Sequence, residues 1–164
     1  MQRMLGTGAA TSSYDDIERA AALLVVGANA LDCHPVVGAR IRQRARNGAR
    51  LLVIDPRCTA LAASAELHLA PRPGTDIALL NAIGHVLLRE GLVDEPFLAA
   101  RVDGRDEYAR HGAAWTPERA AASCGVAVEA IVAAARLYGG TRPALAFHGL
   151  GLTEQLQGTE GVMA

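Results

Sequence analysis

Short apolar runs, each followed by a glycine, a proline or a polar residue, most limit what this chain can fold into. Residues 22–26 and 51–54 are unbroken apolar runs, which are typical of strands buried on both faces of a parallel sheet. Two further segments, Glu66-Leu67-His68-Leu69 and residues 144–148, have the length of strands. Helical patterns separate the runs. This alternation predicts a doubly wound α/β fold, Rossmann-like with three layers and a mainly parallel sheet.

The helical patterns begin and end at recognisable residues. Ser13 and Asp16 fit a capping box for a short helix over 14–21. Pro35 opens a helix that Gly48 stops. Further helices are expected over 59–63, 77–90 and 128–138, with extra short helices after residue 92 that begin at the N-caps Asp94 and Thr116.

The composition suits one globular domain, which we place over residues 1–164. Hydrophobic residues make up 51% of the chain but aromatic residues only 4%, so Ala, Leu, Val and Ile must build the core. A net charge of −1 disfavours a nucleic-acid-binding protein. All 16 basic residues are arginine, which excludes a Schiff-base or Walker A lysine.

Cysteine spacing and hydropathy exclude further classes of protein. Cys33, Cys58 and Cys124 fit no zinc or iron–sulfur spacing, so no metal ligand is expected. No apolar stretch approaches the roughly 18 residues that a membrane span needs, and residues 1–8 lack the pattern of a signal peptide. We therefore expect a cytoplasmic protein, and a periplasmic one only if an export signal precedes this segment.

Candidate ligand-binding loops follow each predicted strand, because ligands of open α/β sheets bind beyond the carboxyl ends of the strands. The loops carry small and polar residues, which let a ligand approach the backbone. The loop from Gly27 to His34 precedes a helix N-terminus, where free N–H groups favour a phosphate. The other loops lie at 55–57, 72–76 and 148–151.

Three side chains in these loops suit a nucleotide. Asp55 ends the second strand 28 positions after Gly27, close to where a ribose-binding carboxylate lies in dinucleotide folds. Arg57 is suited to pair with phosphate. Asp76 is able to accept two hydrogen bonds from the N1–H and amino group of a guanine. The loops therefore predict a nucleotide site at this edge of the sheet.

Purely structural roles are open for several of these residues. Asp76, together with Thr75, and Asp32 each have the chemistry to cap the helix that follows. Gly27 suits a tight turn, and His34 a helix cap or an exposed position. The fingerprint G-x-G-x-x-G does not follow the first strand, which disfavours an NAD-dependent dehydrogenase. A stand-alone nucleotide-binding regulatory module stays open.

An ordered series of segments covers nearly the whole chain and resembles a known family. The segments are LLVVGANALDCHPVVGARI, GARLLVIDPR, LHLAPRPGTDIALLNAIGHVLLREGLVDEPFL and HGLGLTEQLQGTEGVMA. Together they resemble the catalytic subunit of molybdopterin-dependent formate dehydrogenases, within the molybdopterin oxidoreductase family. The resemblance implies a single-domain fragment, one of the dinucleotide-binding α/β domains of a larger subunit.

The resemblance assigns cofactor-binding residues, and no catalytic residue, to this segment. The first loop, near the phosphates and the pterin, contributes Gly27, Asn29, Asp32 and His34. The D-P-R segment, near the ribose and guanine, contributes Asp55 and Arg57. The P-G-T-D segment, whose aspartate meets the guanine edge, contributes Gly74, Thr75 and Asp76. The loop near the pterin contributes Gly149, Leu150, Gly151 and Thr153.

Two positions depart from the family's pattern. Ala30 stands where the family often has proline, which loosens the first loop without removing a donor. Glu154 stands where glutamine commonly follows G-x-G-x-T, with Gln155 next, so the contact made there is open.

The resemblance also implies cofactors and partners. The family binds molybdenum or tungsten between two molybdopterin guanine dinucleotides, and the parent enzyme alone carries iron–sulfur clusters. The implied reaction converts formate to carbon dioxide and passes two electrons to the clusters, although another substrate such as nitrate stays open. The implied partners are the remaining domains of the parent chain, electron-transfer subunits and formate. The family's metal-binding and cluster cysteines lie upstream of this segment, so the isolated segment is predicted to be inactive.

Overall fold

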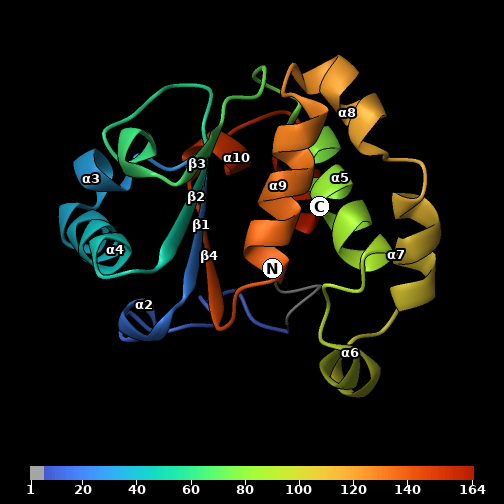
Figure 1. The fold of residues 1–164 in the computed structure, drawn as a ribbon, viewed down its shortest axis with the longest axis horizontal. Helices are drawn as coiled ribbons and strands as arrows, with labels where there is room; N and C mark the ends of the chain where they lie inside the picture. Colours follow the sequence, from blue (N-terminus) through green and yellow to red (C-terminus); the bar gives the residue numbers. More distant parts are fainter. Residues whose placement is uncertain (1–5) are drawn as a thin grey trace.

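One parallel sheet organises residues 6–164, which the computed structural model describes (Figure 1). Its spatial order is β3-β2-β1-β4. The strands are β1 (Ala22–Val26), β2 (Arg50–Ile54), β3 (Leu67–Leu69) and β4 (Ala144–His148). All neighbouring pairs are parallel. The predicted doubly wound fold is confirmed, and the order matches the first four strands of the common dinucleotide-binding arrangement.

Helices cover both faces of the sheet (Figure 1). One face, drawn in blue to cyan, carries α2 (Asp16–Arg19), α3 (Ala30–Cys33), α4 (Pro35–Arg46) and the 3₁₀ helix η1 (Ala62–Ser64). The opposite face carries α5 (Asp76–Arg89) and α9 (Val128–Gly139). Three further helices, α7 (Arg105–Gly112), α8 (Pro117–Cys124) and α11 (Gly158–Met163), contact α5, and α8 also contacts α9. The short helix α6 (Glu95–Arg101) precedes α7, and α10 (Leu150–Thr153) follows β4.

The central strands are apolar throughout because both of their faces are buried. Leu24 and Leu52 pack into the core beneath α5 and α9. Leu23 and Leu51, their neighbours in the chain, pack into the core beneath α4. Burial on both faces explains why neither strand shows the polar alternation of a one-sided sheet.

Strand β4 lies at the open edge of the sheet and is less covered. Leu145 and Phe147 pack against the core beneath α4, whereas Ala144, Ala146 and His148 are exposed. Pro143, which has no backbone N–H, precedes the strand. The register pairs Val26 of β1 with both Ile54 and His148, so three strands end in step. Their following loops therefore meet at one edge.

Most predicted boundaries agree with the structure to within one or two residues. The caps Asp94 and Thr116 are confirmed, since their side chains accept the backbone N–H groups of Phe97 and Arg119. The helices predicted over 77–90 and 128–138 are α5 and α9.

Two predicted helices are too long, and one strand is shorter than expected. The helix expected over 14–21 is only α2, because the chain must become extended at Ala20 to enter β1. The helix expected over 59–63 is the single 3₁₀ turn η1, and the third strand begins at Leu67 instead of Glu66.

No single helix among residues 6–164 is long and apolar enough to cross a membrane. Only α8 and α9 taken together, bent by 116° at their junction, reach that length and composition. Part of the stretch considered for a signal peptide, residues 1–5, lies outside the described residues.

Candidate functional site

A cavity of about 670 Å³ lies beyond the carboxyl ends of the strands, a size typical of ligand pockets. The loops after β1, β2, β3 and β4 all contribute to its wall. Ten of the thirteen predicted site residues line it: Gly27, Asn29, His34, Asp55, Arg57, Gly74, Asp76, Gly149, Leu150 and Gly151. The parallel register brings these residues together from four segments that are distant in the sequence.

The glycine-containing loops after β1 and β4 contact each other through their backbones and form part of the cavity wall. The N–H of Gly151 donates to the carbonyl of Gly27 at 2.9 Å. A Cβ atom on Gly151 would lie 2.7 Å from that carbonyl oxygen, closer than real Cβ contacts come. Gly27 itself has a φ of +56°, a conformation that glycine adopts at little cost. The two loops therefore depend on glycine for both conformation and contact.

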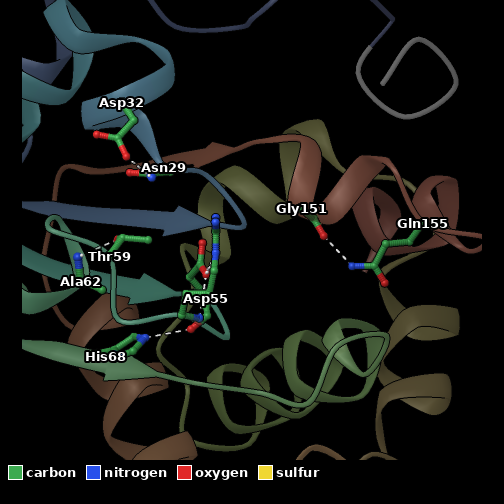
Figure 2. Close-up of polar contacts among 9 residues, drawn as sticks. Asn29, Asp32, Asp55, Thr59, Ala62, His68, Gly151 and Gln155 are labelled. Carbon is green, nitrogen blue, oxygen red and sulfur yellow. Dashed lines mark hydrogen bonds and ion pairs between the residues drawn. The ribbon is translucent and has the colours of Figure 1, made fainter.

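Asn29 presents an acceptor without a partner to this edge of the sheet. Its Nδ2 donates to the Oδ2 of Asp32 at 2.6 Å (Figure 2). Its Oδ1 is buried and accepts no hydrogen bond from residues 6–164. Buried polar atoms are bonded in nearly all native structures, so this oxygen suits a donor supplied by a ligand.

Asp55 and Arg57 form a charged pair after β2. The Asp55 side chain is 3% exposed, and its Oδ1 accepts the backbone N–H of Arg57 at 2.9 Å and lies 3.5 Å from the Arg57 Nε. The Nε2 of His68 donates to the Asp55 carbonyl at 2.8 Å (Figure 2). The Arg57 side chain is 71% exposed. Its outer N–H groups are thus available to an anionic ligand while Asp55 stays fixed.

Asp76 is a buried carboxylate at the first residue of α5. It is 9% exposed, and its Oδ2 accepts from the Nε2 of Gln155 at 3.2 Å. The alternative that Asp76 and Thr75 cap α5 is wrong. Thr75 occupies the N-cap position without a side-chain capping bond, and its hydroxyl donates to the carbonyl of Arg72. The Asp76 carboxylate is therefore available to the cavity, which it lines.

Three predicted site residues do not line the cavity. Asp32 is turned toward Asn29, Thr75 toward Arg72, and Thr153 toward the carbonyl of Gly149. The alternative that Asp32 caps α4 is also wrong, since His34 precedes that helix and makes no capping bond.

Seven residues that the prediction did not include also line the cavity: Ala28, Cys33, Pro56, Pro71, Pro73, Glu154 and Gln155. Most are neighbours of predicted residues. Gln155 follows Gly151 by four residues, one helical turn, and its Nε2 donates to the Gly151 carbonyl (Figure 2). No local signal in the sequence singles out Gln155, because it lies beyond the end of α10 and its bond to Asp76 is a tertiary contact. Among residues 6–164 no three His, Cys, Asp or Glu side chains gather in a way that suits a metal ion.

The donors and acceptors of the cavity suit a ligand with a base and phosphates. Glycine-rich backbone permits close approach, Arg57 supplies a cation and His34 an imidazole, and Asp76 and Asn29 supply acceptors. The fold and the cavity together define the class of protein: a doubly wound α/β domain with a ligand-sized cavity at the carboxyl edge of its parallel sheet.

The chain belongs to the molybdopterin oxidoreductase family, whose family model matches residues 4–164. The predicted resemblance is confirmed. Membership implies a molybdopterin cofactor with molybdenum or tungsten. The Asn29 oxygen that accepts no hydrogen bond from the described residues, and the close backbone contact of Gly27 with Gly151, fit a bound group of that kind.

Formate dehydrogenases are among the most similar relatives. The chain is 41% identical over 157 residues to F420-dependent formate dehydrogenase 1 subunit alpha from Methanococcus maripaludis, covering 96% of this chain and 23% of that protein. It is 37% identical over 162 residues to formate dehydrogenase H from Escherichia coli, covering 99% of this chain and 23% of that protein. Nitrate reductases also match, at lower identity or over a shorter stretch. The chain spans about a quarter of the length of these formate dehydrogenases.

A solved structure has the same fold. Acetylene hydratase from Pelobacter acetylenicus superimposes with a TM-score of 0.80 at 25% sequence identity, over 87% of this chain and 20% of that one. This chain therefore corresponds in fold to about a fifth of that larger protein.

Proposed function

We propose that this chain binds the guanine dinucleotide form of molybdopterin as one domain of a larger oxidoreductase. The carrying observation is the Asp76 carboxylate, which is 9% exposed and lines the cavity. A fixed carboxylate accepts the N1–H and amino group of guanine together, a pair of donors that adenine does not present. Asp55 would hold the ribose, and Arg57 the phosphates.

The glycine loops would hold the pterin end. The backbone contact between Gly27 and Gly151 forms a wall without side chains, against which a planar group can lie. Asn29, with its free acceptor, would take an N–H from the same group. When bound, the metal of the cofactor would take up the electrons of the reaction, and the residues of this chain bind and orient the group that carries it.

The reaction proposed for the parent enzyme is the oxidation of formate to carbon dioxide, which releases one proton and two electrons. The names of the formate dehydrogenase relatives, at 41% and 37% identity, support this substrate. Nitrate is the second candidate, since nitrate reductases are also relatives. Further domains, iron–sulfur clusters and electron-transfer subunits belong to the same proposal.

Calorimetric titration of the chain with GMP, GDP, AMP and ADP tests the ligand class. Guanine nucleotides should bind more tightly than adenine nucleotides. Asp76→Asn places an N–H₂ group where an acceptor is needed, so we expect it to weaken guanine binding by about tenfold or more. Asp103→Asn, the same change at an exposed loop position, should have no effect. Equal affinity of the wild type for guanine and adenine nucleotides would contradict the proposal.

A further inference from the structure

Gln155 makes two bonds that join the loop after β4 to the first residue of α5. Its Nε2 donates to the Oδ2 of Asp76 at 3.2 Å and also to the carbonyl of Gly151. An amide nitrogen carries two protons, so one nitrogen satisfies both acceptors. Gln155 and Asp76 lie 79 positions apart in the chain, so the bond between them is a tertiary contact.

The same side chain also lies against the turn before α5. The amide oxygen of Gln155 is 3.9 Å from where a Cβ on Gly74 would be. Gly74 has a φ of +83° and precedes Asp76 by two residues. Gln155 is half-buried at this position. The carboxylate of Asp76 is therefore bounded by Gln155 on the side of the turn.

We propose that Gln155 is a positioning residue that holds the Asp76 carboxylate in the orientation that recognises guanine. The proposal rests on the proposed function of Asp76 and adds a determinant of base specificity. Because a carboxylate oxygen accepts more than one hydrogen bond, Oδ2 keeps an acceptor site after it has bonded to Gln155. Both oxygens can then meet a base while the amide stays in place.

Loss of the amide donor should loosen the carboxylate. Two hydrogen bonds to one base demand that both oxygens lie in one plane with it, whereas a single bond tolerates rotation. A positioning role therefore predicts a larger loss for a base with two donors than for a base with one. Guanine presents N1–H and an amino group, and hypoxanthine presents N1–H alone.

Titration of GMP and IMP into the wild type and Gln155→Leu provides the specificity readout. We expect the wild type to prefer GMP over IMP and the variant to lose most of that preference, with the ratio of the two affinities falling by about fivefold to tenfold. Gln43→Leu is the matched control, since Gln43 is an exposed glutamine on α4 that does not line the cavity; its ratio should equal that of the wild type. An unchanged ratio in Gln155→Leu overturns the positioning role.

A double-mutant cycle tests the contact itself without any ligand. Thermal midpoints are measured for the wild type, Asp76→Ala, Gln155→Ala and the double variant. A direct contact predicts non-additive shifts, with the double variant less destabilised than the sum of the single variants. Additive shifts overturn the inference. A wild type that does not distinguish guanine contradicts the proposed function instead, and the cycle then decides whether Gln155 holds Asp76.

Discussion

Gly151 shows at the scale of one residue how the backbone forms the site. We expect Gly151→Ala to lower the thermal midpoint by about 2–12 °C, which corresponds to about 1–3 kcal/mol of overpacking. The reason is the 2.7 Å approach of the added Cβ to the Gly27 carbonyl, which must move aside. Nucleotide affinity should fall as well, because the wall of the cavity shifts with it. Thermal denaturation and calorimetry provide the two measurements.

Gly112→Ala is the control for this substitution. Gly112 ends α7, and a Cβ there would meet no heavy atom within 4 Å among the described residues. The variant should be as stable as the wild type or slightly more stable, since alanine favours a helix. Equal effects of the two substitutions would show that the loop contact is not responsible.

Glu154 places a negative charge in the wall of a cavity that we propose for an anionic ligand. We expect Glu154→Gln to strengthen the binding of GDP by roughly twofold to fivefold, the size of a charge interaction across about 10 Å of partly solvated site. The gain should shrink as salt is added. Glu107→Gln, at an exposed position on α7, should leave affinity unchanged. Weaker binding by Glu154→Gln would mean that the carboxylate contacts the ligand favourably.

At the scale of elements, one ion pair joins the start of β2 to the residue before β3. Both the Nε and Nη2 atoms of Arg50 donate to the Glu66 carboxylate, with the Nε at 3.0 Å from Oε2. These hydrogen bonds hold the pKa of Glu66 below its ordinary value of 4.5. The pair therefore adds stability that is fully present above pH 4.5 and is lost as the pH falls through the lowered pKa of the folded state.

Glu66→Gln should consequently lower the thermal midpoint at pH 7 and have no effect once Glu66 is protonated. Both side chains are nearly half exposed, so we expect only about 0.5 kcal/mol, or roughly 1–2 °C. Melting curves recorded from pH 7 down to pH 3 measure the difference. Arg50→Gln should reproduce the loss at pH 7. A difference between wild type and Glu66→Gln that persists unchanged at low pH would contradict this explanation.

The elements that the sequence predicts well are those whose signals are local. Pro35 fixes the start of α4, and the side chains of Asp94 and Thr116 cap the helices that follow them. The elements predicted poorly depend on tertiary contacts. The chain around Thr59 has helical composition, and Thr59 accepts the N–H of Ala62 as a helix cap would. The chain must nevertheless become extended at Ala65 to enter β3, which leaves room for only one 3₁₀ turn.

At the scale of the whole molecule, the topology could be predicted but not the side-chain directions in the site. A parallel sheet must bring its loops to one edge, which is why ten of the thirteen predicted residues line one cavity. Asp32 and Thr75 lie in the same loops of the sequence as the residues that line the cavity. Their side chains do not line it, because Asp32 bonds to Asn29 and Thr75 bonds to the carbonyl of Arg72. Whether the ten residues bind the cofactor stays a prediction that the titrations test.

The isolated chain should not reduce a dye with formate. Residues 6–164 contain no group of side chains that suits a metal ion, and the chain spans 23% of the formate dehydrogenase of Methanococcus maripaludis. The assay mixes purified chain, formate and an artificial electron acceptor, with a complete formate dehydrogenase as the positive control. Formate-dependent reduction by this chain alone would overturn the view that it contributes binding and not catalysis.

The open edge of β4 has a consequence for how the chain is handled. Among residues 6–164 no further strand pairs with the outer side of β4. Such edges invite pairing with a second copy, although Pro143 and the length of only five residues restrain it. The strand leads directly into Gly149 and Gly151 of the cavity wall. Self-association of the chain through β4 would therefore take place beside the proposed nucleotide site, so the measured affinity would depend on the protein concentration. An affinity measured in a crowded cell or crystal would then differ from one measured at high dilution.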